Sequence, residues 1–246
     1  MIGTWINVGA IWLGALLGLT TKFDLSARRQ QFIKVVLGVA TVWFGFKLMW
    51  NGLADSGGVK SFAYRFFIVL VAMVVGHLLG KICRIQSLFN RLGQTAKKKL
   101  ENAAAKGPNA GNDGFMAATI LFTATPLGIV GGLEDGMSQY WAPLAIKAVM
   151  DALATLSFAR AFGWTTLLSA VPVAALLTAL TVLGSRLEPW LSEQHLIGVV
   201  HASAGLIMTY VALVIFEVKK VEIANYLPAL FVAPALMKLA QMVFGN

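Results

Sequence analysis

Eight long apolar stretches recur along the chain, and they constrain its fold more than any other feature. They cover residues 2–20, 33–51, 65–83, 115–133, 142–160, 164–184, 196–216 and 226–244. A helix needs about 20 mostly apolar residues to cross the hydrocarbon core of a bilayer. Charged residues make up only 13% of the 246 residues, whereas soluble domains carry about 25%. The sequence therefore predicts an all-α, polytopic transmembrane bundle of eight spans, with residues 1–246 forming a single membrane domain.

The composition excludes several classes of function. A single cysteine, Cys83, rules out a disulfide framework within the chain and any metal site built from several cysteines. The three histidines, His77, His195 and His201, do not show the spacing of paired metal ligands. The sequence also lacks a nucleotide-binding loop, a zinc motif and a nucleophile elbow. We therefore expect no catalytic residues, no metal, no cofactor and no enzymatic activity.

Lys and Arg residues lie mostly in alternate loops, which predicts the orientation of the chain. The longest loop, residues 84–113, is rich in basic residues, so the positive-inside rule places it in the cytoplasm. The other loops on that side hold Lys22, Arg28, Arg29, Arg160, Lys219 and Lys220. These loops account for the net charge of +9 without nucleic acid as a partner. Both termini then lie outside, in a multi-pass protein of the bacterial inner membrane.

The long cytoplasmic loop contains a pattern typical of a helix. Its apolar positions at helical spacing are Leu88, Phe89, Leu92, Ala96 and Leu100, with basic residues between them. This pattern predicts an interfacial helix that binds anionic lipids; a flexible basic loop is the alternative. The sequence GPNAGND at 107–113 then predicts a hinge into the fourth span.

The fourth span is predicted to break at membrane depth. Residues 116–136 read MAATILFTATPLGIVGGLEDG, so a proline and several glycines follow an ordinary apolar helix. Helix breakers inside a span are tolerated only against protein or a water-filled cavity. Discontinuous helices of this kind build the binding sites of many transporters. The candidate binding residues in this segment are Thr125, Pro126, Gly128, Gly132, Glu134 and Asp135.

Several of these residues allow two interpretations. Glu134 and Asp135 could form a mouth that concentrates cations by its field, or an ordinary acidic turn on the external side. The hydroxyls of Thr123 and Thr125 could satisfy backbone carbonyls freed by Pro126, or they could coordinate a substrate.

Ionisable and polar residues within other spans are further candidates. Lys147 and Asp151 lie four residues apart in the fifth span and so share one helix face. The pair is either a cation or proton site, with Lys147 as the resting partner of Asp151, or a structural ion pair. Asn7 in the first span needs a polar partner, commonly on another helix. His77 and His201 are candidates for a proton relay, or structural histidines.

Small residues at matching offsets indicate an inverted repeat. Those of the first span are Ala10, Gly14 and Gly18, and those of the sixth are Ala170, Ala174 and Thr178. Units 1–84 and 163–246 would face opposite ways and flank a central pair, 115–160, as in many secondary transporters. Helix packing alone can give the same spacing. We expect Gly14 and Gly18 to be buried at helix contacts, with the broken segment and the fifth span close to the first and sixth spans.

Most of the chain resembles one family of membrane proteins. The segments that carry the resemblance are GTWINVGAIWLGALLGL (3–19), LGVATVWFGFKLM (37–49), LFTATPLGIVGGLEDG (121–136), LAIKAVMDALATLSFARAFGWTTLLSAVP (144–172) and NYLPALFVAPAL (225–236). They are similar to the bacterial YqgA/YdfK-like integral membrane proteins, the family of domain of unknown function 554. Residues that match the family pattern are Asn7, Pro126, Gly128, Gly132, Asp135, Gly136, Lys147, Asp151 and Gly163. The chain departs from the pattern at Glu134, where the family has glutamine, and at Ala152, where it has glycine. The resemblance implies a transport role without naming a substrate.

These features together predict a membrane transporter of a small solute or ion, proton- or cation-coupled through Asp151. An ion-channel-like pore is one alternative. A non-transporting scaffold or lipid-interacting protein, working through the helix at 88–100, is another. The expected partners are the lipid bilayer, anionic lipids at residues 84–113 and an unidentified small solute or ion, while self-association into a homo-oligomer stays open.

Overall fold

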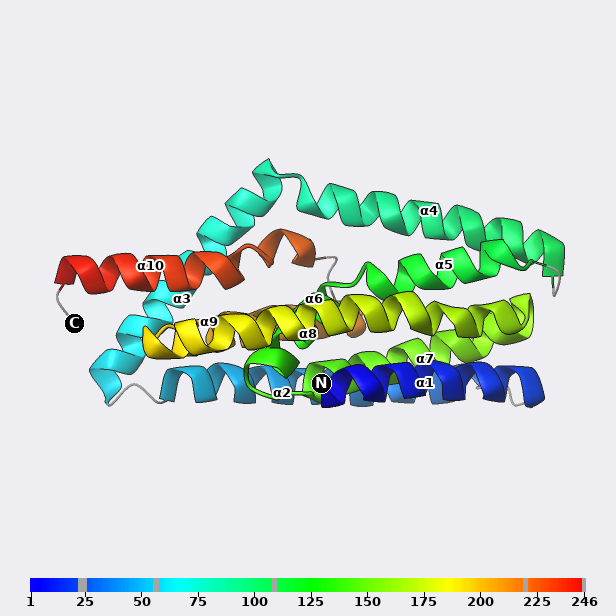
Figure 1. Cartoon of the computed structure of the whole chain (residues 1–246), viewed down its shortest axis with the longest axis horizontal. Coiled ribbons are helices and arrows are strands. Elements are labelled where there is room, and N and C mark those ends of the chain that lie inside the picture. The colour runs from blue at the N-terminus through cyan, green and yellow to red at the C-terminus, as the bar shows by residue number, and fades with distance from the viewer. Residues whose placement is uncertain (22–25, 55–57, 108–109, 219–220, 245–246) are drawn as a thin grey trace. The chain divides into compact units, whose positions relative to one another are not determined.

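The computed structural model describes residues 1–21, 26–54, 58–107, 110–218 and 221–244, and every regular element in these ranges is a helix (Figure 1). The basic residues Lys22, Lys219 and Lys220 of the predicted cytoplasmic loops lie outside the described ranges. The elements are α1 (Ile2–Thr20), α2 (Ala27–Ala54), α3 (Val59–Ile82), α4 (Ile85–Lys106), α5 (Asn112–Thr123), α6 (Pro126–Met137), α7 (Ala142–Phe162), η2 (Trp164–Ser169), α8 (Ala170–Glu193), α9 (Ile197–Ile215), η3 (Ile223–Tyr226) and α10 (Ala229–Phe244). The predicted all-α fold class is confirmed.

Seven of the eight predicted spans have a matching helical segment. Within the described ranges, seven helical segments are long and apolar enough to cross a membrane, and the bent pair α5 and α6 gives an eighth if it is one span. Many large apolar side chains stay exposed, such as Trp43 at 65% and Phe67 at 65%. Such exposure suits a surface that faces lipid instead of water. The chain is therefore a polytopic helical membrane protein.

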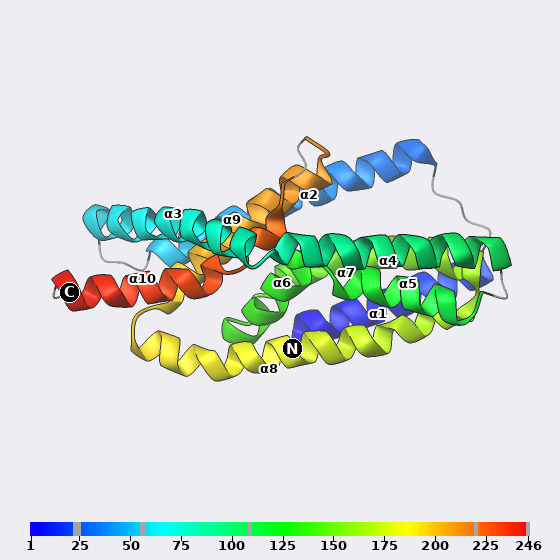
Figure 2. The same ribbon diagram turned by 90° about the horizontal axis from the view of Figure 1, so that it is seen from above.

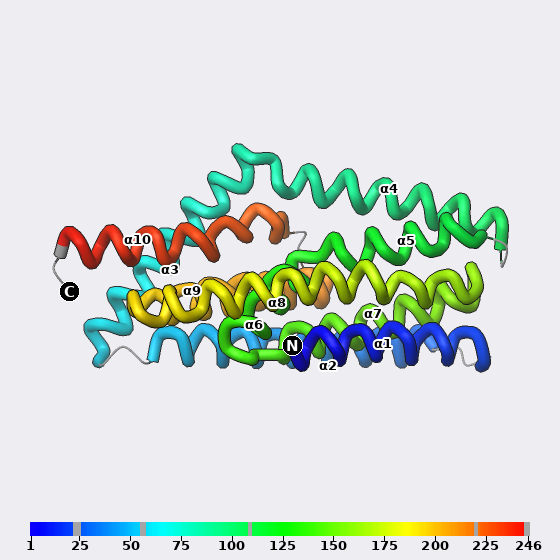
Figure 3. The backbone as a smooth tube through the Cα atoms, viewed as in Figure 1, coloured from blue at the N-terminus to red at the C-terminus, as the bar shows by residue number. Residues whose placement is uncertain are grey.

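The predicted break in the fourth span is present, and its cause is local. α5 ends at Thr123, α6 begins at Pro126, and the two helices are bent by 61° (Figure 3). Thr125 takes an extended conformation because a residue before proline is disfavoured in the helical region. The Thr123 hydroxyl donates to the Thr119 carbonyl at 2.7 Å. This bond stays within α5, and it does not reach the carbonyl that the missing N–H of Pro126 would have bonded, which belongs to Phe122.

The chain divides into two compact units. Unit 1 comprises Met1–Gln30 and Ser87–Gly184, and unit 2 comprises Gln31–Gln86 and Ser185–Asn246. This division does not test whether the first three and last three spans are related, so the inverted repeat stays a prediction.

Unit 1 is built on the close packing of α1 against α7. The backbone of Ala152 leaves no room for a side chain at Gly14, and the Leu156 carbonyl leaves none at Gly18. Both glycines are buried, as predicted from their spacing. On the other side of the unit, Gly132 of α6 packs against Leu180 of α8. The broken segment and the fifth span therefore do lie close to the first and sixth spans.

Unit 2 uses the same kind of small-residue contact. α2 crosses α9 where Gly45 meets Gly205 and again where Gly52 meets Gly198. α3 packs against α10 at Gly76, where an added Cβ would lie 2.7 Å from the Cα of Ala229. Small residues at helix crossings let the backbones approach closely, which is how helices associate in lipid.

α4 confirms the predicted helix in the long basic loop, but part of its surface is already covered by protein. Ala96 and Ala103 are fully buried, and Ala103 packs with Phe162 of α7. Figures 1 and 2 show α4 running beside α5. Lys99 and Lys106 of α4 both pair with Asp113, at 2.8 and 2.6 Å. As predicted, α4 and α5 are separate helices, since α4 ends at Lys106 and α5 begins at Asn112; the predicted hinge is too long by two residues, because Asp113 already belongs to the first turn of α5.

Candidate functional site

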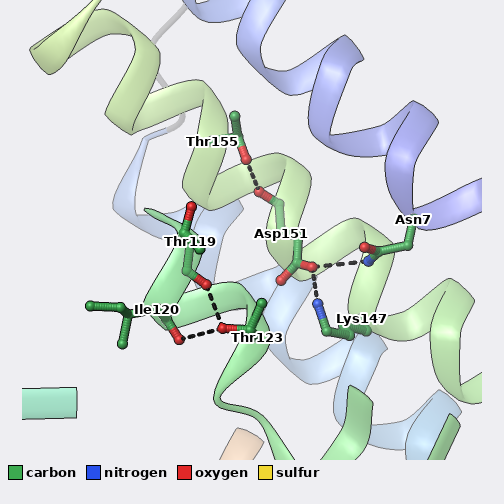
Figure 4. Close-up of polar contacts among 7 residues, drawn as sticks. All are labelled: Asn7, Thr119, Ile120, Thr123, Lys147, Asp151 and Thr155. Carbon is green, nitrogen blue, oxygen red and sulfur yellow. Dashed lines mark hydrogen bonds and ion pairs between the residues drawn. The ribbon is translucent and has the colours of Figure 1, made fainter. Parts of the chain in front are cut away.

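The candidate site is a buried cluster of one carboxylate, one ammonium and one amide. Lys147 donates from Nζ to Oδ2 of Asp151, and Asn7 donates from Nδ2 to the same oxygen at 2.9 Å (Figure 4). The exposed fractions are 2% for Lys147, 5% for Asp151 and 0% for Asn7. The predicted partnership of Lys147 and Asp151 is confirmed in its geometry, and the partner of Asn7 proves to be Asp151.

The helices α1 and α7 together position this cluster. Lys147 and Asp151 lie one helical turn apart on α7, which brings their side chains together. The close contact of Gly14 with Ala152 brings α1 near enough for Asn7 to reach across. Thr155 donates its hydroxyl to the Asp151 backbone carbonyl at 2.6 Å, one turn further along α7. The polar atoms of the cluster thus converge at a glycine-mediated helix contact.

The first turn of α6 lies against this cluster. A Cβ built on Gly128 would lie 3.1 Å from Cε of Lys147 and 2.9 Å from Oγ1 of Thr125. Pro126 is the first residue of α6, a position that proline suits because the N–H it lacks would have no partner within the helix. Gly128 therefore leaves space for the lysine side chain beside the break. Gly132, by contrast, packs on Leu180 and does not face Lys147.

The expectation that Glu134 and Asp135 form an acidic external turn is wrong. Both residues lie inside α6 and are 1% exposed. The amino group of Met1 lies 3.1 Å from Oδ2 of Asp135, and the Ser138 hydroxyl donates to Glu134 Oε2 at 3.3 Å. α6 continues through Gly131 and Gly132, where small residues let neighbouring helices of unit 1 pack closely.

Tyr140 follows α6 and is influenced by one of these acids. Burial, and to a smaller extent the negative charge of Glu134, raises the pKa of Tyr140 to about 12. Its phenol therefore stays protonated at neutral pH.

The two histidines proposed for a proton relay belong to unit 2, whereas the Asp151 cluster belongs to unit 1. The ring of His77 packs on Tyr226 with centroids 4.5 Å apart. His201 lines a cavity at one end of unit 2. The two histidines thus have different surroundings within unit 2: His77 packs on a tyrosine ring, and His201 lies at a cavity.

Some polar contacts of the structure were not predicted by any pattern in the sequence. Thr4 and Thr181 share a hydrogen bond of 3.3 Å between α1 and α8, and both side chains are buried. Arg160 donates to the Thr21 carbonyl at 3.2 Å. Asp113 could have been noticed as an acid beside a strongly basic segment, since a carboxylate there has cations within reach.

Comparison with known proteins places the chain in a family. The model of the family described as "Protein of unknown function (DUF554)" matches residues 2–238. The chain belongs to the DUF554 family. It is 24% identical over 237 residues to "Uncharacterized protein YqgA" of Escherichia coli (strain K12), covering 96% of both chains. It is equally 24% identical over 237 residues to "Uncharacterized membrane protein YdfK" of Bacillus subtilis (strain 168), again with 96% of both covered. No solved structure matches the chain.

Membership of the DUF554 family agrees with the helical membrane fold. The name of the Bacillus subtilis relative describes a membrane protein, and the match extends from the start of α1 into α10. The Asp151 cluster, the α5–α6 break and the buried acids of α6 all fall within the matched residues.

Proposed function

We propose that this DUF554 protein transports a small solute or ion across the bacterial inner membrane, coupled to a proton or cation that binds at Asp151. One observation carries the proposal: Lys147, Asp151 and Asn7 form a buried polar cluster at the α1–α7 contact, beside the first turn of α6. Ionisable groups within membrane spans commonly mark ion pathways and proton relays.

The energetics of a buried ion pair favour a functional role over a purely structural one. Replacing such a pair by well-packed apolar residues is often neutral, or stabilising by about 1–4 kcal/mol. On α7 the lysine precedes the aspartate, which is the less favourable order for a pair four residues apart on a helix. A proton or cation that reaches Asp151 would therefore compete with Lys147, whose place before Asp151 on the helix makes their attraction weaker.

Unused oxygen atoms near the cluster support a cation as the competing species. Within the described part of the chain, Oδ1 of Asn7 and Oγ1 of Thr125 are buried and have no hydrogen-bond partner. Small hard cations such as Na⁺ prefer oxygen ligands, as Ca²⁺ and Mg²⁺ do. Together with the Asp151 carboxylate, these atoms offer part of the oxygen donor set that such a cation requires.

The contact between Lys147 and Gly128 supplies a way to couple ion binding to movement. A cation at Asp151 would release the Lys147 ammonium, whose side chain rests on the first turn of α6. Because the α5–α6 segment is already interrupted, its two half-helices can shift without breaking helical hydrogen bonds at that point. A ligand shifts a conformational equilibrium by its difference in affinity for the two states.

The test uses purified protein in proteoliposomes, with charge movement recorded after jumps in proton or sodium concentration. We expect transient currents from the native protein and none from the double variant Lys147→Met/Asp151→Asn, which removes both charges. The matched control is Lys34→Met/Glu217→Gln, which removes an exposed pair of the same type (2.6 Å) and should behave as the native protein.

The other outcomes decide against the proposal in distinct ways. Full activity of the Lys147→Met/Asp151→Asn variant would reduce the pair to a structural contact and move the ion site elsewhere. Steady currents above about a million ions per second would indicate a pore, because collective motions take microseconds or longer. Silence of the native protein toward both ions would favour a scaffold.

A further inference from the structure

Unit 2 contains a cavity of about 430 Å³, lined by residues near the ends of α2 and α8 and the starts of α3 and α9. This volume lies within the range of about 300–1,000 Å³ that is typical of small-molecule sites. The polar side chains that line it are Asn51 of α2, Arg65 of α3, Ser192 of α8, His195 of the α8–α9 turn and His201 of α9.

Among the described residues, the lining of the cavity carries the positive charge of Arg65 and includes no acidic residue. In the described ranges Arg65 has no carboxylate within ion-pair distance, and its buried Nε has no hydrogen-bond partner. Buried polar groups are normally hydrogen-bonded. The acid Glu188 contacts one lining residue, Ser192, whose hydroxyl donates a hydrogen bond of 2.8 Å to it. Since no carboxylate of the described residues pairs with the Arg65 guanidinium, its charge favours an anion in the cavity.

The first turn of α9 adds backbone donors to the same place. α9 begins at Ile197, and its N-cap residue, Leu196, provides no side-chain cap. The first N–H groups of a helix have no partner within it, and the helix dipole favours negative charge there. Ile197 and Gly198 line the cavity, and a Cβ built on Gly198 would lie 3.1 Å from Nη1 of Arg65. The guanidinium thus rests directly on this turn.

We propose that the cavity binds an oxyanion of the phosphate type, held between the Arg65 guanidinium and the first turn of α9. The planar fork of arginine matches two oxygens of such a group. The side chains of Asn51 and His195 also line the cavity and can donate hydrogen bonds to the other oxygens. The phosphate is either a free anion or the headgroup of a lipid. The site shares no residue with the Asp151 cluster, so it does not depend on the transport proposal.

The test measures the thermal unfolding midpoint of the full chain, purified in neutral detergent, as sodium phosphate is added. Sodium chloride of equal ionic strength is the reference. A ligand that binds only the folded state raises this midpoint in a saturable way. We expect Arg65→Gln to weaken the apparent affinity at least tenfold and Arg65→Lys to weaken it less. Arg186→Gln, which removes the same charge from an exposed position on α8, should leave it unchanged.

A second arm identifies the source of the phosphate. Native mass spectrometry would compare phosphatidylglycerol adducts of the native protein, Arg65→Gln and Arg186→Gln after release from nanodiscs. A saturable rise with inorganic phosphate that depends on Arg65 assigns a free anion. Adducts that are lost only in Arg65→Gln, without a response to inorganic phosphate, assign a headgroup. Binding of both probes that is indifferent to Arg65, or no binding of either, overturns the proposal.

Two further variants keep the test decisive if Arg65→Gln does not fold. Asn51→Asp places a negative charge in the cavity at almost unchanged volume and should abolish binding of the phosphate. His195→Asn keeps the backbone, because His195 has φ 56 and asparagine tolerates this left-handed conformation. It should weaken binding by removing one imidazole donor. Unchanged affinity in both variants would count against the site.

Discussion

Asp151 accepts two hydrogen bonds on one oxygen, Oδ2, from an ammonium and an amide that lie on different helices. A buried carboxylate at membrane depth needs such partners, because no water is available to replace them. Lys147 has the same need, and Asp151 is the carboxylate that meets it. At the residue scale, each charge of the pair is therefore tolerated only because of the other.

This dependence predicts a pattern of stability among three variants. Asp151→Asn leaves the Lys147 ammonium buried without a carboxylate, which should destabilise the protein by about 3–5 kcal/mol. The double variant Lys147→Met/Asp151→Asn should recover most of this loss, because no charge remains buried. The measurement is reversible unfolding in mixed detergent micelles. A double variant as unstable as Asp151→Asn would show that the lysine charge is not the cause.

The glycines of α1 allow a second prediction with a built-in control. Gly14 has the Ala152 Cα 2.9 Å from the position of a Cβ, whereas Gly9 has no atom within 4 Å. Gly14→Ala should therefore separate α1 from α7 and destabilise unit 1 by about 1–3 kcal/mol, as overpacking does. Gly9→Ala should be neutral or slightly stabilising, because alanine favours the helix. Equal unfolding midpoints for the two variants would contradict the close packing of these helices.

At the scale of elements, the lysines of α4 fall into two groups, one paired with an acid of α5 and one exposed. Lys99 and Lys106 are held by Asp113 at the start of α5, and Ala96 and Ala103 face the protein. Lys97 and Lys98 are exposed. The anionic-lipid contact predicted for residues 84–113 should therefore depend on the exposed lysines and not on the pair that Asp113 holds.

The prediction for α4 compares two variants of the full chain. Lys97→Gln/Lys98→Gln should lower the affinity for phosphatidylglycerol by roughly fivefold per lysine, since each basic residue near an anionic surface contributes about 1 kcal/mol. Lys99→Gln should instead lower the unfolding midpoint, because it removes one of two cations bound to Asp113. Phosphatidylglycerol titrated into purified protein, with adducts counted by native mass spectrometry, gives the first quantity. Loss of lipid affinity in Lys99→Gln alone would reverse the assignment.

At the scale of the whole molecule, the number and order of spans determine the orientation. Seven helices in the described ranges, with the bent α5–α6 pair as the eighth, give an even number of crossings if that pair spans the bilayer. An even number puts both termini on one side. The basic residues of α4 and its neighbouring loop then predict, by the positive-inside rule, that both termini lie outside.

Reporter fusions check this orientation directly. Alkaline phosphatase joined after Asn246 should be active, because it folds only on the external side, and a fluorescent protein there should be dark. A fluorescent protein inserted into the loop after α4, near Gly107, should be bright. An internal reporter at both positions would mean that α5 and α6 enter and leave on the same face instead of spanning.

Span positions, the break at Pro126 and the helix at residues 85–106 were all predictable from sequence. They depend on local properties, namely hydropathy over about 20 residues, the missing N–H of proline and helical periodicity. The pairing of Lys147 with Asp151 was predictable for the same reason, since one helical turn separates them. In a membrane, backbone groups must be satisfied within each segment, so local sequence decides the helices.

Contacts between distant segments were decided only by the tertiary structure. The sequence showed that Asn7 needs a partner, but only the packing of α1 on α7 made that partner Asp151, 144 residues away. The burial of Glu134 and Asp135 inside α6 contradicted their appearance as a polar turn, because neighbouring helices cover them. The cavity beside Arg65 likewise joins residues of α2, α3, α8 and α9. Hydropathy fixes which segments become helices, whereas the fit of side chains between helices decides which polar groups meet.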